Sequence, residues 1–360
     1  MKSVLVGVGQ AGGKLTTALS TFDSQQGFGA VLDGVAINSA RTDLSSLPIE
    51  THLIGGDVVK GHGVGGDNEL GAQIMENELA EVTGVLDGKI PSAAEAIVVV
   101  AGLGGGTGSG GAPVLVRRLK QIYDVPVYAL GVLPGADEPA MYQINAGRSL
   151  KTLLEVADSI LLVDNDAWRS SGESVSEGFD AINRNIARRF GLLFAAGEIT
   201  HGVGESVVDT SEIINTLRSG GISALGFAGA PAADDPAENI TTVMSTTRNA
   251  VLTGTSLPGA STADAALLVV AGDPDRIPRK GVEKARRFIE DETGSMAVRG
   301  GDFPIQSDRI ASLVLLGGLE RSDRVDRFLA RARQAAKEVE SEPKIDRRTV
   351  FDNDEIDTLF

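Results

Sequence analysis

Cysteine is absent from the 360 residues of this chain. Its absence excludes disulfide bonds, thiol catalysis and zinc sites built on thiolates. Histidine occurs only three times, as His52, His62 and His201. Because these three are widely separated, the sequence argues against a histidine metal cluster and against a Ser-His-Asp triad.

Long apolar runs are also missing: no uninterrupted apolar run of the sequence is long enough to span a bilayer. The first residues, MKSVLVGVGQ, lead directly into strand-like sequence, so we expect no signal peptide. We therefore expect a cytoplasmic protein that does not insert into a membrane.

Basic residues are few, and lysine is scarce: 10 lysines and 23 arginines stand against 49 acidic residues. The formal net charge of −16 argues against nonspecific binding to nucleic acid or to an anionic membrane surface. An acidic, lysine-poor composition is common in proteins kept soluble in concentrated salt. A halophilic source is therefore a hypothesis, with an ordinary acidic cytosolic protein as the alternative.

Strand-like and helix-like segments alternate along the first half of the chain. The predicted strands are 3–8, 34–37, 96–101, 125–133 and 159–163, and the predicted helices are 12–21, 68–83 and 112–122. This alternation predicts an α/β fold with an N-terminal doubly wound, mostly parallel sheet. Ligands bind such sheets beyond the C-terminal ends of the strands, where the glycine-rich and Asn/Asp turns of this chain fall.

The second half begins with a long amphipathic helix at 174–194, whose apolar residues recur every three or four positions. Residues 202–229 are expected to form a loop, a short helix and a glycine-rich return. Predicted strands at 265–271 and 310–316, around a helix at 281–292, indicate a smaller C-terminal α/β domain. A charged helix at 321–342 and an acidic end, FDNDEIDTLF, follow. The predicted units are a nucleotide-binding domain, a central helix, a C-terminal domain, and a charged helix with its tail, at 1–173, 174–202, 203–320 and 321–360.

A glycine-rich run, GGGTGSG at 104–110, stands between the strand at 96–101 and the helix at 112–122. Glycines leave backbone N–H groups unobstructed, and together with a helix N-terminus they form an anion site. Thr107 and Ser109 add hydroxyl donors. A flexible loop is the alternative, but such a linker has no reason to join a buried strand to its helix. The run therefore predicts phosphate binding.

A second glycine-rich turn, GVGQAGGK, follows the first strand and fits G-x-G-x-x-G at Gly7, Gly9 and Gly12. With Asp33 as a ribose carboxylate, it supports a rival prediction, an NAD(P)-dependent oxidoreductase. That interpretation leaves the second glycine run unexplained. A Walker A loop is excluded, because Leu15 stands where the magnesium-binding Ser or Thr belongs.

GGGTGSG resembles the phosphate-loop signature of the tubulin/FtsZ superfamily, and GQAG at 9–12 resembles tubulin more than bacterial FtsZ. The resemblance implies a tubulin/FtsZ-type GTPase domain that binds GTP or GDP with Mg²⁺. For Lys14, an exposed helix lysine is the alternative role. The residues that the resemblance assigns to phosphate binding are Gly9, Gln10, Ala11, Gly12, Gly13, Lys14, Gly104, Gly105, Gly106, Thr107, Gly108, Ser109 and Gly110.

Two further turns resemble the family's phosphate and metal loops. Asn38, followed by Ser39, resembles the loop that approaches phosphate and metal. The stretch 63–71, which includes Gly65, resembles the loop that closes over the γ-phosphate, with asparagine replacing the usual proline. Its Asp67 and Glu69 are candidates for holding hydrated Mg²⁺, and capping of the following helix is the alternative.

The base and ribose contacts are also implied by the resemblance. Glu138 matches the ribose loop, since a carboxylate can accept hydrogen bonds from both ribose hydroxyls. Asn165, in DNDA at 164–167, and Asn183 offer amides suited to guanine O6 and N1–H. Phe179, one helical turn before Asn183, can stack on a purine. Core packing for Phe179 and a solvated helix face for Asn183 are the alternatives.

Catalytic groups match the family pattern on the loop after the long helix, which in this family completes the next subunit's site. Asp209 and Glu212 match its two acidic positions, and Val207 replaces the asparagine. Two carboxylates three residues apart can orient and partly deprotonate a water for attack on the γ-phosphate. A helix-capping box is the alternative, and both roles can coexist. The valine predicts slow hydrolysis.

The resemblance covers roughly residues 1–320 and is closest to the archaeal CetZ group. It implies a cytoskeletal GTPase that polymerises head-to-tail, hydrolyses GTP at the subunit interface and acts in cell shape. FtsZ-like cell division and a nucleotide-bound scaffold without hydrolysis are the alternatives. The tail is a candidate docking segment for a membrane adaptor at the inner face of the cell envelope, and a solvated chain end is the alternative.

Overall fold

The computed structural model describes residues 1–168, 175–198, 207–260, 262–319 and 322–341. Within them, ten strands form one sheet in the order β3-β2-β1-β4-β5-β6-β7-β10-β8-β9. The strands are β1 (Ser3–Val8), β2 (Val31–Asn38), β3 (Glu50–Leu53), β4 (Ala96–Gly102), β5 (Val127–Leu133), β6 (Ile160–Asp164), β7 (Ile222–Pro231), β8 (Ala265–Gly272), β9 (Ala297–Pro304) and β10 (Arg309–Gly317).

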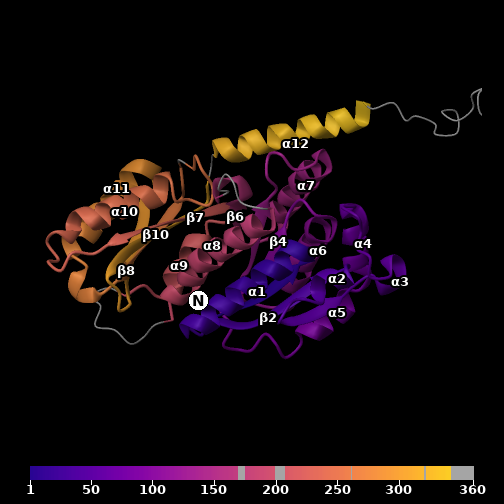
Figure 1. Ribbon diagram of the computed structural model, residues 1–360, viewed down its shortest axis with the longest axis horizontal. Helices are drawn as coiled ribbons and strands as arrows, with labels where there is room; N and C mark the ends of the chain where they lie inside the picture. Colours follow the sequence, from indigo (N-terminus) through magenta and orange to yellow (C-terminus); the bar gives the residue numbers. More distant parts are fainter. Residues whose placement is uncertain (169–174, 199–206, 261, 320–321, 342–360) are drawn as a thin grey trace, which may run out of the picture.

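The helices surround this sheet (Figure 1). They are α1 (Gly9–Gln26), α2 (Arg41–Leu44), α3 (Gly56–Val59), α4 (Asn68–Asn77), α5 (Leu79–Leu86), α6 (Gly106–Ile122), α7 (Ala140–Val156), α8 (Val175–Ala196), α9 (Thr210–Leu217), α10 (Asn239–Leu252), α11 (Arg279–Thr293) and α12 (Asp323–Ser341). Two short 3-10 turns, η1 (Asn165–Trp168) and η2 (Pro274–Arg276), complete them.

The N-terminal six strands are parallel, and alternate residues of β1, β4, β5 and β6 enter two different cores. On β4, Val98 and Val100 face α1 and α8, whereas Ile97 and Val99 face α6 and α7. A strand buried on both sides needs a continuous apolar run, which AIVVVA supplies. The predicted doubly wound, mostly parallel sheet is therefore confirmed.

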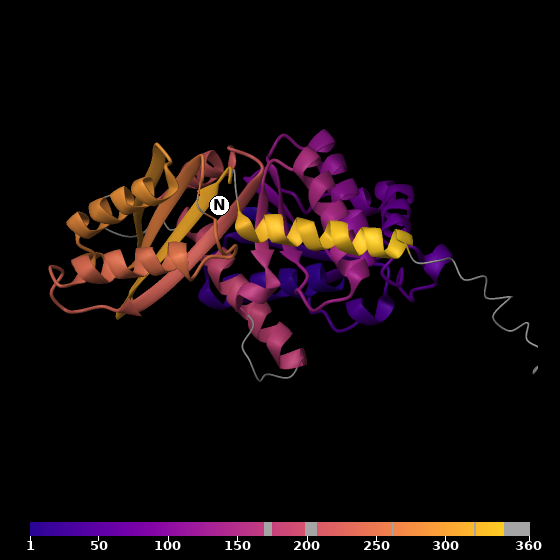
Figure 2. The same ribbon diagram turned by 90° about the horizontal axis from the view of Figure 1, so that it is seen from above.

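The central helix α8 joins the two halves of the molecule. Its buried Ile182, Ile186 and Phe190 belong to one core that reaches from α1 to the inner residues of β8 and β10. The outer residues of β8 and β10 pack instead under α10 and α11, which cover that half of the sheet (Figure 2). The last helix, α12, packs on α7 across the N-terminal half.

Three predicted segments differ from the structure. The helix expected at 68–83 is two helices, because the backbone leaves helical geometry at Glu78, whose carboxylate accepts a hydrogen bond from Gly55 N at 2.8 Å. The glycine-rich return before Gly229 is strand β7. A Cβ on Gly226 would lie 2.2 Å from Ala250 O, so α10 can approach this strand only where it is glycine. The helix expected from residue 112 begins at Gly106, inside the glycine run.

Among the described helices, none has both the length and the apolar character needed to cross a bilayer. The acidic end at 351–360 lies outside the described residues. The predicted four-unit division of the chain stays a prediction.

Candidate functional site

The two glycine-rich turns meet where the strand order of the parallel sheet reverses. From β1 the chain turns into α1 on one face, and from the neighbouring β4 it turns into α6 on the other. Such a switch point opens a crevice beyond the C-terminal strand ends. A cavity of about 790 Å³ lies there, with Gly9 and Gly106 in its wall. The sequence prediction and the topology thus indicate the same place.

Both helices that start at this cavity lack a side-chain cap at their N-terminus. The N-cap residues are Val8 for α1 and Gly105 for α6, and neither side chain carries an oxygen. The first N–H groups of a helix need an acceptor from outside the helix. Two uncapped N-termini in one cavity therefore form a site for a polyanion such as a triphosphate.

The glycines of the α6 run serve close packing and are not a flexible loop. A Cβ on Gly108 would lie 2.6 Å from Gly102 O, and one on Gly110 would lie 2.0 Å from Asn68 O. The helix can therefore press its backbone against the turn after β4 and against α4 only if these residues lack side chains.

The cavity wall contains most of the residues assigned to phosphate from the sequence. These are Gly9, Gln10, Ala11, Lys14, Asn38, Gly65, Gly104, Gly105, Gly106, Thr107 and Gly108. Four others, Gly12, Gly13, Ser109 and Gly110, are buried in the packing of α1 and α6 and do not line it. Asp33, which the dinucleotide interpretation needs, is not in the wall either.

Polar side chains from α1, β2 and α2 form a network in the wall. Asp43 accepts hydrogen bonds from Gln10 Nε2 at 3.1 Å and from Asn38 Nδ2 at 3.0 Å. Behind them, Ser39 Oγ lies 2.7 Å from Thr107 Oγ1, which joins the end of β2 to the start of α6. Sequence reasoning missed Asp43, although its position five residues after Asn38 placed it near this turn.

The loop at 63–67 is tied to the glycine run by a residue that the sequence did not single out. Asn145, buried in α7, donates from Nδ2 to Gly66 O at 2.7 Å and to Gly104 O at 3.0 Å. The Asn145 amide thereby holds the loop at 63–67 and the start of the glycine run, both of which line the cavity, in fixed positions.

The two carboxylates predicted to hold Mg²⁺ are engaged elsewhere in this structure. Asp67 caps α4 by accepting a hydrogen bond from Leu70 N at 3.0 Å. Glu69 pairs with Arg148 at 3.0 Å. Both are exposed and neither lines the cavity. Within the described residues, no group of three or more His, Asp or Glu could hold a metal ion without help from a ligand.

The opposite part of the cavity is lined by Glu138, Asn165 and Asn183. Glu138 Oε1 accepts a hydrogen bond from Gly135 N at 2.7 Å, which fixes the carboxylate against its own loop. Asn165 is buried in η1, and Asn183 projects from α8 beside Ile182. Phe179 belongs to α8, but its side chain lies outside the described residues.

The proposed catalytic pair forms a complete capping box at the start of α9. Asp209 Oδ1 accepts from Glu212 N at 3.1 Å, and Glu212 Oε2 accepts from Asp209 N at 3.3 Å. A hydrogen bond from Ser211 Oγ lowers the pKa of the Asp209 carboxyl below its usual range. Asp209 is exposed, so its carboxylate is ionised and open to solvent.

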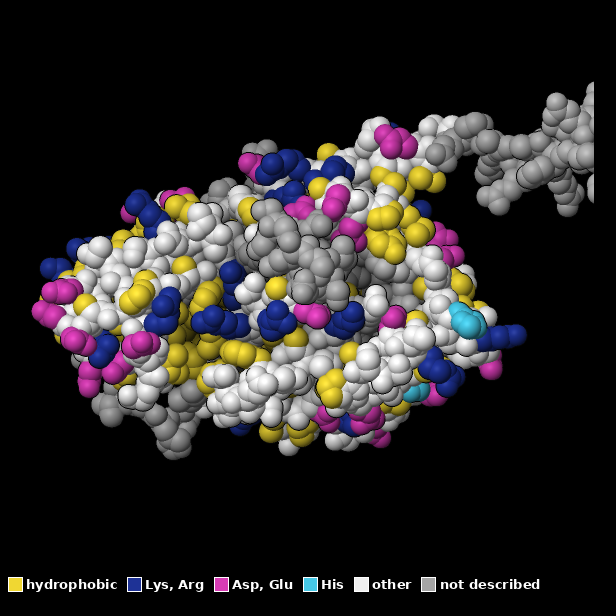
Figure 3. Space-filling view, viewed as in Figure 1, with side chains coloured by type: hydrophobic (Ala, Val, Ile, Leu, Met, Phe, Trp, Pro, Cys, Tyr) yellow, Lys and Arg dark blue, Asp and Glu magenta, His cyan; other side chains and the backbone are white. Residues whose placement is uncertain are grey.

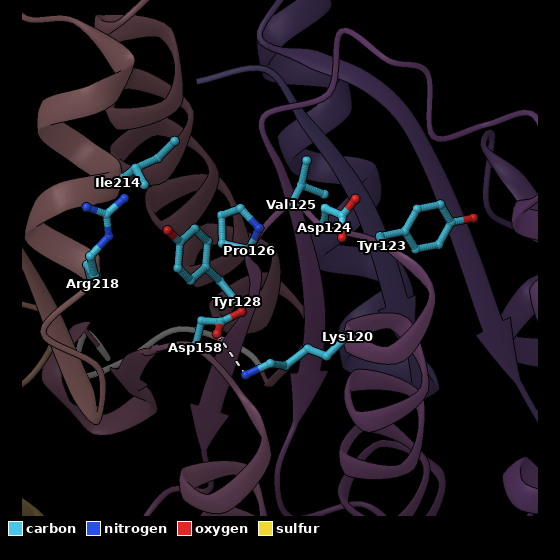
Figure 4. Close-up of a pocket in the computed structure, with 9 residues that line it drawn as sticks. All are labelled: Lys120, Tyr123, Asp124, Val125, Pro126, Tyr128, Asp158, Ile214 and Arg218. Atoms are coloured by element: carbon cyan, nitrogen blue, oxygen red, sulfur yellow. Dashed lines mark hydrogen bonds and ion pairs between the residues drawn. The ribbon is translucent and has the colours of Figure 1, made fainter.

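This pair lies at the end of the sheet opposite to the cavity. Thr210 bonds to Glu198, which pairs with the Met1 amine at the start of β1. Figure 4 shows Ile214 of α9, and Arg218 directly after that helix, beside Tyr128 at the start of β5. The cavity, by contrast, is lined by Leu133 at the end of β5. At about 3.3 Å per residue, the seven residues of β5 separate the two places by about 20 Å.

Comparisons with known proteins agree with this architecture. Residues 2–173 match the GTPase domain of the Tubulin/FtsZ family, and residues 172–334 match the C-terminal domain of tubulin-like CetZ. The chain is 68% identical to tubulin-like protein CetZ2 of Haloferax volcanii, a halophilic archaeon, over the full length of both.

Two solved structures of Haloferax volcanii proteins are also similar. A GTPγS-bound protofilament of CetZ2 has a TM-score of 0.92 at 68% identity, over 95% of this chain and 100% of that chain. A GDP-bound monomer of CetZ1 has a TM-score of 0.86 at 46% identity, over 93% and 100%. The chain belongs to the tubulin/FtsZ family of GTPases, and within it to the CetZ group.

Proposed function

We propose that this protein binds GTP in the cavity at the switch point and uses it to form head-to-tail filaments. The uncapped starts of α1 and α6 supply N–H groups for the phosphates. Glu138, Asn165 and Asn183 line the same cavity: Glu138 would accept hydrogen bonds from the ribose, and the two amides would recognise guanine. The GTPγS and GDP complexes of its relatives support this assignment.

Mg²⁺ would accompany the triphosphate and neutralise part of its charge. Carboxylate and amide oxygens are the protein ligands that suit this ion. Asp43 and Gln10 supply both types in the cavity wall, and a phosphate oxygen would complete the set. Asp67 and Glu69 remain candidates for contact through water.

The hydrolytic groups come from a neighbouring subunit. The single observation that carries this proposal is that the Asp209–Glu212 pair lies at the opposite end of the sheet from the cavity of the same chain, about one strand length away. Two ends so separated meet only when copies stack end to end. The neighbour's carboxylates then orient a water and accept its proton as it attacks the γ-phosphate.

Assembly therefore activates hydrolysis, and the resulting GDP weakens the junction. The expected setting is the cytoplasm, with a role in cell shape. Recruitment to the envelope would use an adaptor that binds the acidic end at 351–360.

Two conservative variants separate catalysis from capping. Asn and Gln oxygens still accept hydrogen bonds, so Asp209→Asn and Glu212→Gln preserve the box while removing negative charge. We expect phosphate release in high-salt buffer to fall by about 10²-fold or more, with unchanged GTP affinity and melting temperature. Undiminished turnover in both variants would refute the catalytic assignment.

A mixing experiment tests whether the site is shared. Asp209→Asn binds GTP but lacks the Asp209 carboxylate. Asn183→Leu, once shown to have lost GTP binding, keeps that carboxylate. In a mixture, GTP on the first variant meets the intact Asp209 of the second, so turnover should reappear. A mixture as inactive as its components, under conditions in which both co-assemble with wild type, would contradict a shared site.

A further inference from the structure

The first turn of α12 carries an arginine that bonds to the turn beside the cavity. Arg324 Nε lies 2.5 Å from Asp164 Oδ2, and Arg324 Nη2 donates to Asp164 Oδ1 at 2.9 Å and to Asp166 Oδ2 at 2.6 Å. One planar guanidinium thus spans two carboxylates, which a lysine ammonium could not reproduce.

These two carboxylates flank Asn165, the residue between them that lines the cavity. Asp164 Oδ1 also accepts a hydrogen bond from Asp166 N at 3.2 Å. This bond spans Asn165 and stabilises the backbone turn at that residue. The position of the Asn165 amide therefore depends on where the two carboxylates are held.

The same contact reaches the loop before α7. Asp166 Oδ2, which accepts from Arg324, also accepts from Ala136 N at 2.8 Å. Two residues further along that loop is Glu138, in the cavity wall. Gln143 Nε2 secures the loop from its other side by donating to Gly135 O at 2.7 Å.

We propose that Arg324 is a positioning residue that holds the base-binding and ribose-binding loops of the nucleotide site in one arrangement. It does so through Asp164 and Asp166 and does not itself line the cavity. This inference rests on the proposed function, because it assigns those loops to guanosine. It makes the C-terminal helix a part of the nucleotide site.

The Arg324 side chain is 14% exposed and the Asp164 side chain is 3% exposed, so solvent and salt screen the contact between them only partly. Figure 3 shows Lys and Arg side chains gathered over α12. Arg327, one turn further along that helix, is exposed, and among the described residues it donates only to Asp323 O of its own helix. Arg327→Gln is therefore a matched control for Arg324→Gln.

The test measures binding of a fluorescent GTP analogue to the full chain in high-salt buffer, with the melting temperature recorded in parallel. We expect Arg324→Gln to weaken binding by about tenfold or more, mainly through faster release, and Arg324→Lys to restore it only in part. Arg327→Gln should match wild type.

A double-mutant cycle separates positioning from general damage. Asp166→Asn should weaken binding to a similar extent, and adding Arg324→Gln to it should weaken binding little further. Wild-type affinity in Arg324→Gln, or fully additive losses in the double variant, would overturn the inference. Failure of the wild-type chain to bind GTP would instead contradict the proposed function.

Discussion

The Gln10 amide, at the start of α1, donates to the Asp43 carboxylate of α2 at 3.1 Å. Asp43 also accepts from Asn38, so one carboxylate aligns two amides in the wall of the nucleotide cavity. Asp43 is half-buried, whereas Asp67 and Glu69 are exposed. This arrangement places a negative group where a cation that accompanies phosphates would be stabilised.

We therefore expect Asp43→Asn to raise the Mg²⁺ concentration needed for half-maximal GTP binding by about tenfold. The amide keeps the size of the side chain but lowers the charge that attracts the ion. Asp67→Asn, which preserves the cap of α4, is the comparison variant and should raise this concentration less, because Asp67 would contact the ion only through water. The reverse pattern would favour the Asp67 and Glu69 site predicted from the sequence.

Asn145 should matter to both stability and nucleotide binding. Asn145→Ala leaves the carbonyls of Gly66 and Gly104 without their donor in a buried place, which costs about 1–3 kcal/mol. We expect a similar loss in the free energy of unfolding by denaturant and a severalfold weaker GTP affinity. Lys151→Ala, at an exposed position of the same helix, should change neither quantity. Unchanged affinity in Asn145→Ala would mean that the two loops keep their positions without it.

The sequence predicted the parallel sheet and the two glycine-rich turns that meet at the cavity, because apolar runs and glycines are local signals. It did not predict Asn145 or Arg324. Arg324 binds a carboxylate 160 positions away, and Asn145 binds a carbonyl 41 positions away. Such contacts form only when the tertiary fold brings separate segments together, so no local sequence pattern predicts them. The glycine run was interpreted incompletely, because its last residues, Ser109 and Gly110, are buried in helix packing and do not line the cavity.

Guanine selectivity should depend on Asn183. Asn183→Asp replaces an amide donor with a carboxylate that can only accept, so it would face guanine O6 with a repulsive charge. We expect GTP affinity to fall by about tenfold or more, without a gain of ATP binding. Asn185→Asp, two positions along α8 and exposed, adds the same charge away from the cavity. Equal losses in the two variants would attribute the effect to general charge and not to base recognition.

Val207 is the position at which this chain departs from the asparagine of the family pattern. Its side chain is 36% exposed, and its backbone pairs with that of Asp302 in β9. It lies two residues before Asp209, the N-cap of α9. An amide there would add a polar contact for the attacking water or the neighbour's nucleotide, so Val207→Asn should speed single-turnover hydrolysis severalfold. Val207→Ala removes apolar surface without adding an amide and should not. Because hydrolysis needs a junction, both rates must be compared at equal polymer mass. An unchanged rate in Val207→Asn would show that the missing amide does not limit hydrolysis.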